Sequence, residues 1–217
     1  LASTSPLVAI LAHGWATAVI DTEVSNSFSY SLLQVGKAPA VSYMGPGQVL
    51  RYARSRAELG TSDADWDSVD LLPGASDSSL AIVQGRPAIS VRSSGLKYLR
   101  HLGSNVLNEA NWELVSIDTV SIGANSLALV DGRPAIAYQS NGSDSELRFA
   151  FSSTATGTLD TDWASIPIDS ADPSTGSGCS LALVDGKPAI SYICGDDDTL
   201  RYAHSSSPAG VLPTDWQ

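Results

Sequence analysis

The chain has 217 residues, and 43% of them are apolar, which is enough to bury the core of a globular domain. Its formal net charge of −11 and isoelectric point near 4.4 argue against nucleic-acid and anionic-membrane ligands, because an acidic surface repels phosphate groups. No uninterrupted apolar run approaches the roughly 18 residues of a membrane-spanning helix, so we expect no membrane insertion.

Tryptophan marks a repeat along the chain. Its five copies are separated by 51, 46, 51 and 53 residues and stand at Trp15, Trp66, Trp112, Trp163 and Trp216. A period near fifty residues indicates tandem copies of one structural unit. We therefore expect a single domain over residues 1–217, with repeats at about 15–65, 66–111, 112–162 and 163–215, and with residues 1–14 ending a preceding repeat.

Each repeat predicts four short strands and shows no helix-period pattern. The first strand is an almost wholly apolar run such as Ser126–Val130, typical of a strand buried on both faces. A two-residue turn, Asp131-Gly132 in this copy, joins it to a second strand that Pro134 opens. The third strand alternates apolar and basic residues, as in Leu147–Ala150, and the fourth begins at tryptophan, as in Trp112–Asp118.

Four antiparallel strands per unit at this period predict an all-β fold, a β-propeller with about four four-stranded blades. One blade cannot cover both of its faces, whereas blades stacked round an axis bury them against each other. A β-sandwich, the rival arrangement, predicts no such period. Leu1–Trp15 aligns without a gap with Tyr202–Trp216, so a strand at Trp15–Asp21 can pair with the last three strands and close a four-bladed ring. Five or more blades are the alternative if the chain is part of a longer array.

At these motifs the sequence resembles the propeller repeats of uncharacterised secreted and surface proteins of bacteria. Ser180–Val184, Pro188–Tyr192 and Leu200–Ala203 show the shared pattern in the last copy. Ser62–Trp66 and Asp160–Trp163 have a looser similarity to the Asp-box turn of sialidase-like propellers, although both lack its Gly-x-Thr part. The resemblance implies a propeller fold and little about activity, since propellers include enzymes, lectins and scaffolds.

A basic residue recurs at one position of every third strand: Arg51, Lys97, Arg148 and Arg201. A sialidase-like enzyme would need an arginine cluster on its axis, but a catalytic residue is needed only once, so repetition favours a structural role. We expect these residues to pair with carboxylates of neighbouring strands, which also recur, at Asp21, Asp118 and Asp169.

Tyrosine is the first candidate for ligand binding. Tyr43, Tyr138 and Tyr192 end second strands and lead into loops that differ between copies. Loops that vary on a repeated frame are where recognition usually lies, and a tyrosine ring stacks on a sugar or anchors a protein contact. The alternative is that these rings pack between blades.

An acidic loop is the second candidate. Asp196, Asp197 and Asp198 offer oxygen ligands for Ca²⁺, although they lack the pattern of an EF-hand, and a solvated turn is the alternative. We expect no other cofactor.

The two cysteines predict a disulfide. If the hairpin turn lies at Asp185-Gly186, Cys179 and Cys194 fall on the same face and two residues out of register, so a bulge would bring them together. Such a bond would fit an oxidising compartment. Two buried thiols are the alternative.

These patterns together predict a non-enzymatic binding or assembly module outside the cell or at the cell surface. A protein partner or self-association is favoured because the loop at Leu7–Leu11 is apolar where the other copies are polar, and a carbohydrate ligand stays open. The alternative is an Asp-box, sialidase-like glycoside hydrolase, which would need two facing carboxylates.

Overall fold

The computed structural model describes residues 15–25, 29–142, 145–170, 175–195 and 198–217. The predicted contact at Leu7–Leu11 lies outside these residues. Within them the only helices are four single 3-10 turns, η1 (Asp63–Asp65), η2 (Glu109–Asn111), η3 (Asp160–Asp162) and η4 (Pro213–Asp215). None of these is long and apolar enough to cross a membrane.

All other regular structure in the described part of the chain is β-strand, arranged in four antiparallel sheets. The first sheet has β1 (Ser31–Val35), β2 (Ala38–Gly45), β3 (Val49–Ser55) and β4 (Trp66–Leu72). The second has β5 (Ser76–Val83), β6 (Arg86–Arg92), β7 (Leu96–His101) and β8 (Trp112–Asp118). The third has β9 (Ile122–Val130), β10 (Arg133–Asn141), β11 (Ser145–Ser152) and β12 (Trp163–Asp169). The fourth has β13 (Thr175–Val184), β14 (Lys187–Cys194) and β15 (Thr199–His204), and a bridge from Ser205 to Trp216 begins a further strand.

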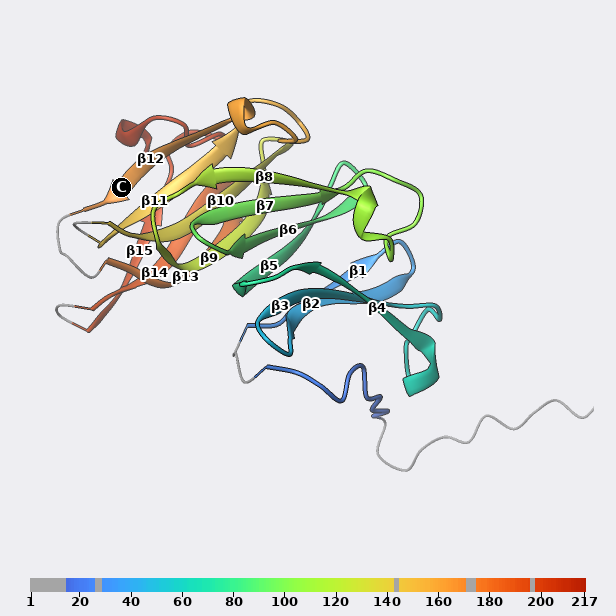
Figure 1. The fold of residues 1–217 in the computed structure, drawn as a ribbon. Helices are drawn as coiled ribbons and strands as arrows, with labels where there is room; N and C mark the ends of the chain where they lie inside the picture. The colour runs from blue at the N-terminus through green and yellow to red at the C-terminus, as the bar shows by residue number, and fades with distance from the viewer. Residues whose placement is uncertain (1–14, 26–28, 143–144, 171–174, 196–197) are drawn as a thin grey trace, which may run out of the picture.

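The four sheets follow one another in chain order along an open arc (Figure 1). The first strand of each sheet packs against the first strand of the next, so β1 meets β5, β5 meets β9, and β9 meets β13. The predicted pairing of Trp15–Asp21 with the last three strands is not seen. That segment lies against the first sheet instead, where Asp21 contacts Tyr43 of β2 and Arg51 of β3. Among the described residues no ladder joins β13–β15 to β1–β4.

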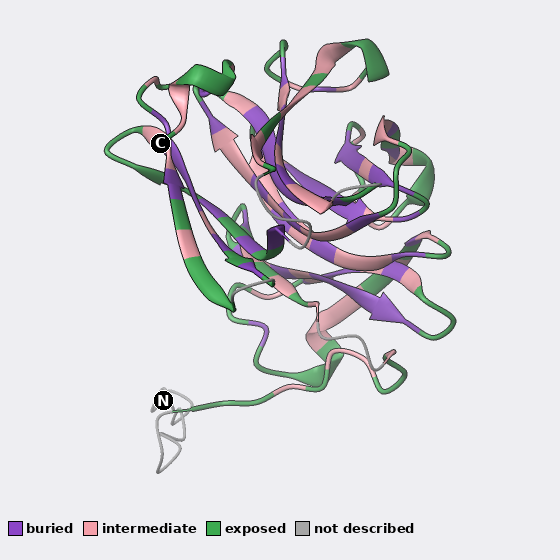
Figure 2. Ribbon diagram, turned by 90° about the vertical axis from the view of Figure 1, so that its left-hand side faces the viewer, coloured by how far each residue is buried: buried purple, intermediate pink, exposed green. Residues whose placement is uncertain are grey.

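The core lies between neighbouring sheets, where buried residues concentrate (Figure 2). At each junction a fully buried aromatic ring of one third strand meets the tryptophan of the next sheet, with ring centroids 5.0–5.1 Å apart: Tyr52 with Trp112, Tyr98 with Trp163, and Phe149 with Trp216. Complete burial of such a ring contributes about 2–3 kcal/mol. The repeated tryptophan therefore holds successive sheets together.

The turn before each tryptophan is built around its indole. Trp66 Nε1 donates to the Gly60 carbonyl at 2.9 Å, and the Asp65 carboxylate accepts from the Ser62 N–H at 3.1 Å. Gly60 has φ +58°, and a Cβ atom there would lie 2.9 Å from the Trp66 ring. The segment Ser62–Trp66 thus stabilises a turn.

The predicted disulfide is absent, and both Cys179 and Cys194 are buried thiols. The prediction was wrong because β13 shifts register twice against β14, once on each side of Ser177. These shifts turn Cys179 toward the third sheet, where its Sγ lies 3.5 Å from the Ala137 carbonyl oxygen. Cys194 Sγ instead lies 3.7 Å from Thr175 Oγ1.

Candidate functional site

The three candidate tyrosines are buried, and each binds a carboxylate of the segment or strand that precedes its own sheet. Their hydroxyls donate at 2.8 Å to a carboxylate oxygen six residues beyond a tryptophan: Tyr43 to Asp21, Tyr138 to Asp118, and Tyr192 to Asp169. In the second and third pairs this aspartate ends the fourth strand of the preceding sheet. The rings are not presented to solvent, so their first role is to fix these carboxylates.

A basic residue of the third strand completes each group. Arg51 Nη1 lies 2.8 Å from Asp21, and its Nε lies 2.6 Å from Asp70. Arg201 Nη1 lies 3.1 Å from Asp169. The predicted pairing with neighbouring carboxylates is confirmed for these two arginines. Arg148 Nε instead donates to the hydroxyl of Tyr138 at 3.1 Å.

We call these groups the Asp–Tyr–Arg clusters, and each contains three residues: Asp21, Tyr43 and Arg51; Asp118, Tyr138 and Arg148; Asp169, Tyr192 and Arg201. Their arginine side chains are between 20% and 27% exposed, so each cluster has a solvent-exposed side, formed by the arginine, and a buried side. Rigid guanidinium and carboxylate groups at a surface present fixed donors and acceptors to a ligand.

One junction departs from this pattern in two residues at once. Between the first and second sheets, Leu72 stands where the other junctions have aspartate, and Val91 stands where they have tyrosine. Lys97, at the arginine position, contacts Ser116 instead. The hydroxyl and the carboxylate are therefore replaced together, as expected if each exists to satisfy the other.

The protonation states follow from burial and these contacts. Burial, assisted by the neighbouring carboxylate, raises the pKa of Tyr43 to about 12, and it also raises the pKa of Tyr138 and of Tyr192. Partial burial acts to raise the pKa of Asp21 too, but bonds from a backbone N–H, the Tyr43 hydroxyl and Arg51 prevail and lower it. At neutral pH the phenols donate and the Asp21 carboxylate is charged.

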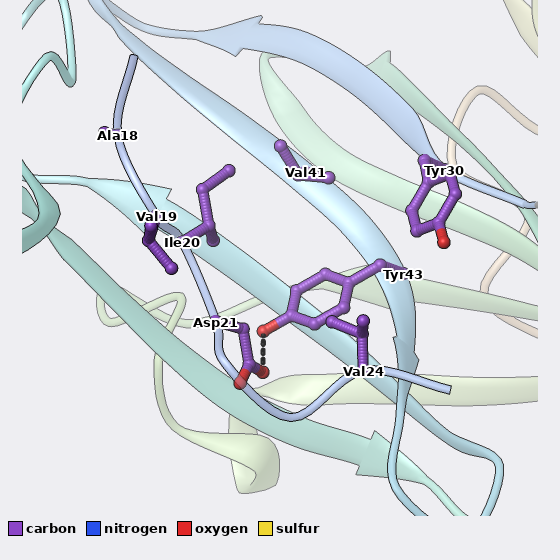
Figure 3. A pocket seen from close by; sticks show the side chains of 8 residues that line it. All are labelled: Ala18, Val19, Ile20, Asp21, Val24, Tyr30, Val41 and Tyr43. Atoms are coloured by element: carbon purple, nitrogen blue, oxygen red, sulfur yellow. Dashed lines mark hydrogen bonds between the residues drawn. The ribbon is translucent and has the colours of Figure 1, made fainter. Parts of the chain in front are cut away.

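The first cluster borders a hollow of about 310 Å³ between the segment before β1 and the first sheet (Figure 3). Figure 3 shows Asp21 and Tyr43 facing each other, with Tyr30 at the far side. The lining is mainly apolar: Ala18, Val19, Ile20, Asp21, Val24, Tyr30, Val41 and Tyr43.

The candidate calcium loop is only partly placed. Asp196 and Asp197 lie outside the described residues, while Asp198 is an exposed turn residue with φ +52°. Among the described residues, no group of three histidine, cysteine, aspartate or glutamate side chains is placed to hold a metal ion. The Ca²⁺ prediction for this loop stays a prediction.

No protein-family model matches the chain, and no curated protein matches it by sequence. Solved structures do resemble it. The Aleuria aurantia lectin in complex with Fucα1-6GlcNAc has a TM-score of 0.60 at 15% identity, over 91% of this chain and 64% of the lectin. Another structure of that lectin, described as a six-bladed β-propeller with a novel fucose recognition mode, has the same TM-score and coverages at 16% identity.

Glycoside hydrolases resemble the chain as well. A GH43 α-L-arabinofuranosidase of Clostridium thermocellum has a TM-score of 0.54 at 13% identity, over 83% of this chain and 69% of the enzyme. The fold is that of a β-propeller. At these identities the likeness extends to the fold alone, and this propeller spans less than two thirds of the lectin.

The prediction, made from the repeats, that the protein is not an enzyme is wrong. Several similar structures are GH43 proteins, among them glycoside hydrolases, and another is a xylan β-1,4-xylosidase, so the fold is compatible with an enzyme. The physical reason is that the recurring residues hold blades together, and they carry no information about side chains that a blade uses once.

Proposed function

We propose that this propeller recognises carbohydrate, and that sugar hydroxyl groups bind at the exposed side of the Asp–Tyr–Arg clusters. One observation carries the proposal: in all three clusters a partly exposed arginine donates to an oxygen at the end of a buried tyrosine. That oxygen belongs to the aspartate bound by the tyrosine in two clusters, and to the Tyr138 hydroxyl itself in the third. Vicinal hydroxyls of a sugar offer paired donors and acceptors, which suit a guanidinium beside a carboxylate.

Two further facts support a carbohydrate ligand. The segments that lead from the second to the third strands differ in sequence, so equivalent clusters carry different neighbours: Glu146 contacts Arg148, and Thr199 Oγ1 lies 3.2 Å from Arg201. The lectin with this fold binds a fucosylated disaccharide, and the enzyme with this fold is an arabinofuranosidase. We further propose an extracellular or cell-surface location, where such glycans are displayed.

A glycan array followed by calorimetry with the best ligand tests the proposal. Arg148→Gln and Arg201→Gln should each remove one binding site, so the number of sugar molecules bound per chain should fall by one in each variant. Lys97→Gln is the matched control, because it changes a basic residue at the same strand position of the junction without the carboxylate and tyrosine. Absence of any glycan binding, or an equal loss in Lys97→Gln, would contradict the proposal.

The same proteins should be incubated with chromogenic arabinosides and xylosides. Hydrolysis that stops in Arg148→Gln or Arg201→Gln would place turnover at the clusters as well as binding. Hydrolysis that persists in both variants would place the chemistry elsewhere in the propeller.

A further inference from the structure

Neighbouring sheets are joined in one repeated way, which predicts what each exposed end of the arc would fit. The buried third-strand ring of one sheet covers the tryptophan of the next, as described above. In addition, the serine that opens each first-strand motif accepts a hydrogen bond of 2.9–3.0 Å from a leucine N–H of the following sheet: Ser31 from Leu80, Ser79 from Leu127, and Ser126 from Leu181.

The last sheet presents these joining groups to solvent. Tyr202 is 58% exposed and Leu200 is 78% exposed, whereas their counterparts in the first three sheets are fully buried. Ser180, which corresponds to the accepting serines, is also exposed. This surface, which we call the leading face, has the form that the other sheets use to hold a following sheet.

The first sheet presents the complementary groups. Leu32 is 72% exposed, while the corresponding Leu80, Leu127 and Leu181 are 6–7% exposed beneath a preceding sheet. Tyr30, just before β1, is exposed as well. We call this surface the trailing face, and it continues the interface established between neighbouring sheets.

The segment Trp15–Asp21 already lies where the fourth strand of a preceding sheet would lie. The Val19 N–H donates to Asp63 Oδ1 at 2.7 Å, as the Ser116 N–H of a true fourth strand, β8, donates to Asp160 Oδ1 at 3.0 Å. Asp21 likewise contacts Tyr43 as the aspartates that end β8 and β12 contact their tyrosines. The hollow in Figure 3 is therefore the place that the inner strands of a preceding blade would fill.

We infer that the leading face of one copy docks on the trailing face of a second copy, head to tail. In this contact the sheet β13–β15 of one copy lies beside the Trp15–Asp21 segment of the second copy. Trp216 begins a fourth strand on this sheet, and the segment of the second copy continues that strand. A second copy carries both surfaces of this contact, and three junctions inside the chain already show them to be complementary. The contact is heterologous, so it joins two different surfaces.

Sedimentation velocity of the purified chain tests this inference, which is independent of the proposed function. The wild-type chain should form species of two or more copies that increase with concentration. Tyr202→Asp, on the leading face, and Leu32→Asp, on the trailing face, should each sediment as one copy. Both side chains are exposed, so circular dichroism and the urea midpoint should match the wild type.

Mixing the two variants gives the sharper result. Each retains one intact face of opposite kind, so the mixture should form a species of two copies and nothing larger. Leu159→Asp, at an exposed position in the loop between β11 and β12, is the matched control and should associate like the wild type. A wild-type chain that stays single, a mixture that does not associate, or loss in only one of the two face variants would overturn the inference.

Discussion

Replacing Tyr138 by phenylalanine removes one hydroxyl from the junction of the second and third sheets and keeps the ring. That hydroxyl donates to Asp118 Oδ2 at 2.8 Å, lies 2.8 Å from Ser165 Oγ and accepts from Arg148 Nε at 3.1 Å. The side chain is fully buried. A hydrogen bond with a charged partner contributes about 1.5–3 kcal/mol, so Tyr138→Phe should lower the free energy of unfolding by about 2 kcal/mol.

The first junction indicates how that loss can be recovered. Leu72 and Val91 occupy the positions of Asp118 and Tyr138 there, and the sheets pack without either polar group. Removing both partners of a buried hydrogen bond costs less than stranding one. The double variant Asp118→Leu/Tyr138→Phe should therefore be more stable than the sum of the single effects, by about 1 kcal/mol or more.

Urea unfolding followed by tryptophan fluorescence gives the four free energies of this cycle. Tyr52→Phe is the matched control, since the buried Tyr52 hydroxyl has no hydrogen-bond partner among the described residues, and its removal should cost nothing. The reasoning fails if Tyr138→Phe costs less than about 0.5 kcal/mol, if Tyr52→Phe costs as much, or if the double variant is additive.

Three further measurements test other parts of the structure. Ellman's reagent should find two thiols in denaturant without reductant and none in the native chain, because Cys179 and Cys194 are buried and burial raises the pKa of Cys179 to about 12; a count of zero in denaturant would restore the disulfide. Asp21→Asn should reduce the loss of unfolding free energy at acid pH. The lowered pKa of Asp21 gives stability that is present above about pH 3.8 and is lost as the pH falls through the folded value. A free energy of unfolding with the same acid dependence in both proteins would contradict this. Gly60→Ala should cost at least about 1 kcal/mol more than Gly85→Ala in urea, since both have positive φ but only Gly60 meets a ring, and equal costs would count against the packing described.

Local signals in the sequence predicted the strands well. The fourth strand expected at Trp112–Asp118 is β8 with the same bounds, and the run Ser126–Val130 forms the end of β9. Apolar alternation, the Asp-Gly turn and the tryptophan each act within one hairpin, so a single repeat contains the information.

Contacts between sheets were harder to predict. The pairing of Arg51 with Asp21 was expected from recurrence alone and is confirmed, yet the burial of Tyr43 was one of two alternatives. Cys179 shows why: bulges in β13 at Gly176 and Gly178, which have φ +98° and +60°, move its side chain to another face, and the register of the hairpin turn alone does not reveal them.

The replacement of one polar pair by Leu72 and Val91 gives the molecule an order of disassembly. Each later junction loses a buried hydrogen bond when either partner is removed, whereas the first junction has no such bond to lose at that position. Variants that lack the Tyr138 or Tyr192 hydroxyl should therefore loosen the later sheets first, and a protease should leave β1–β4 and β5–β8 as the resistant pair.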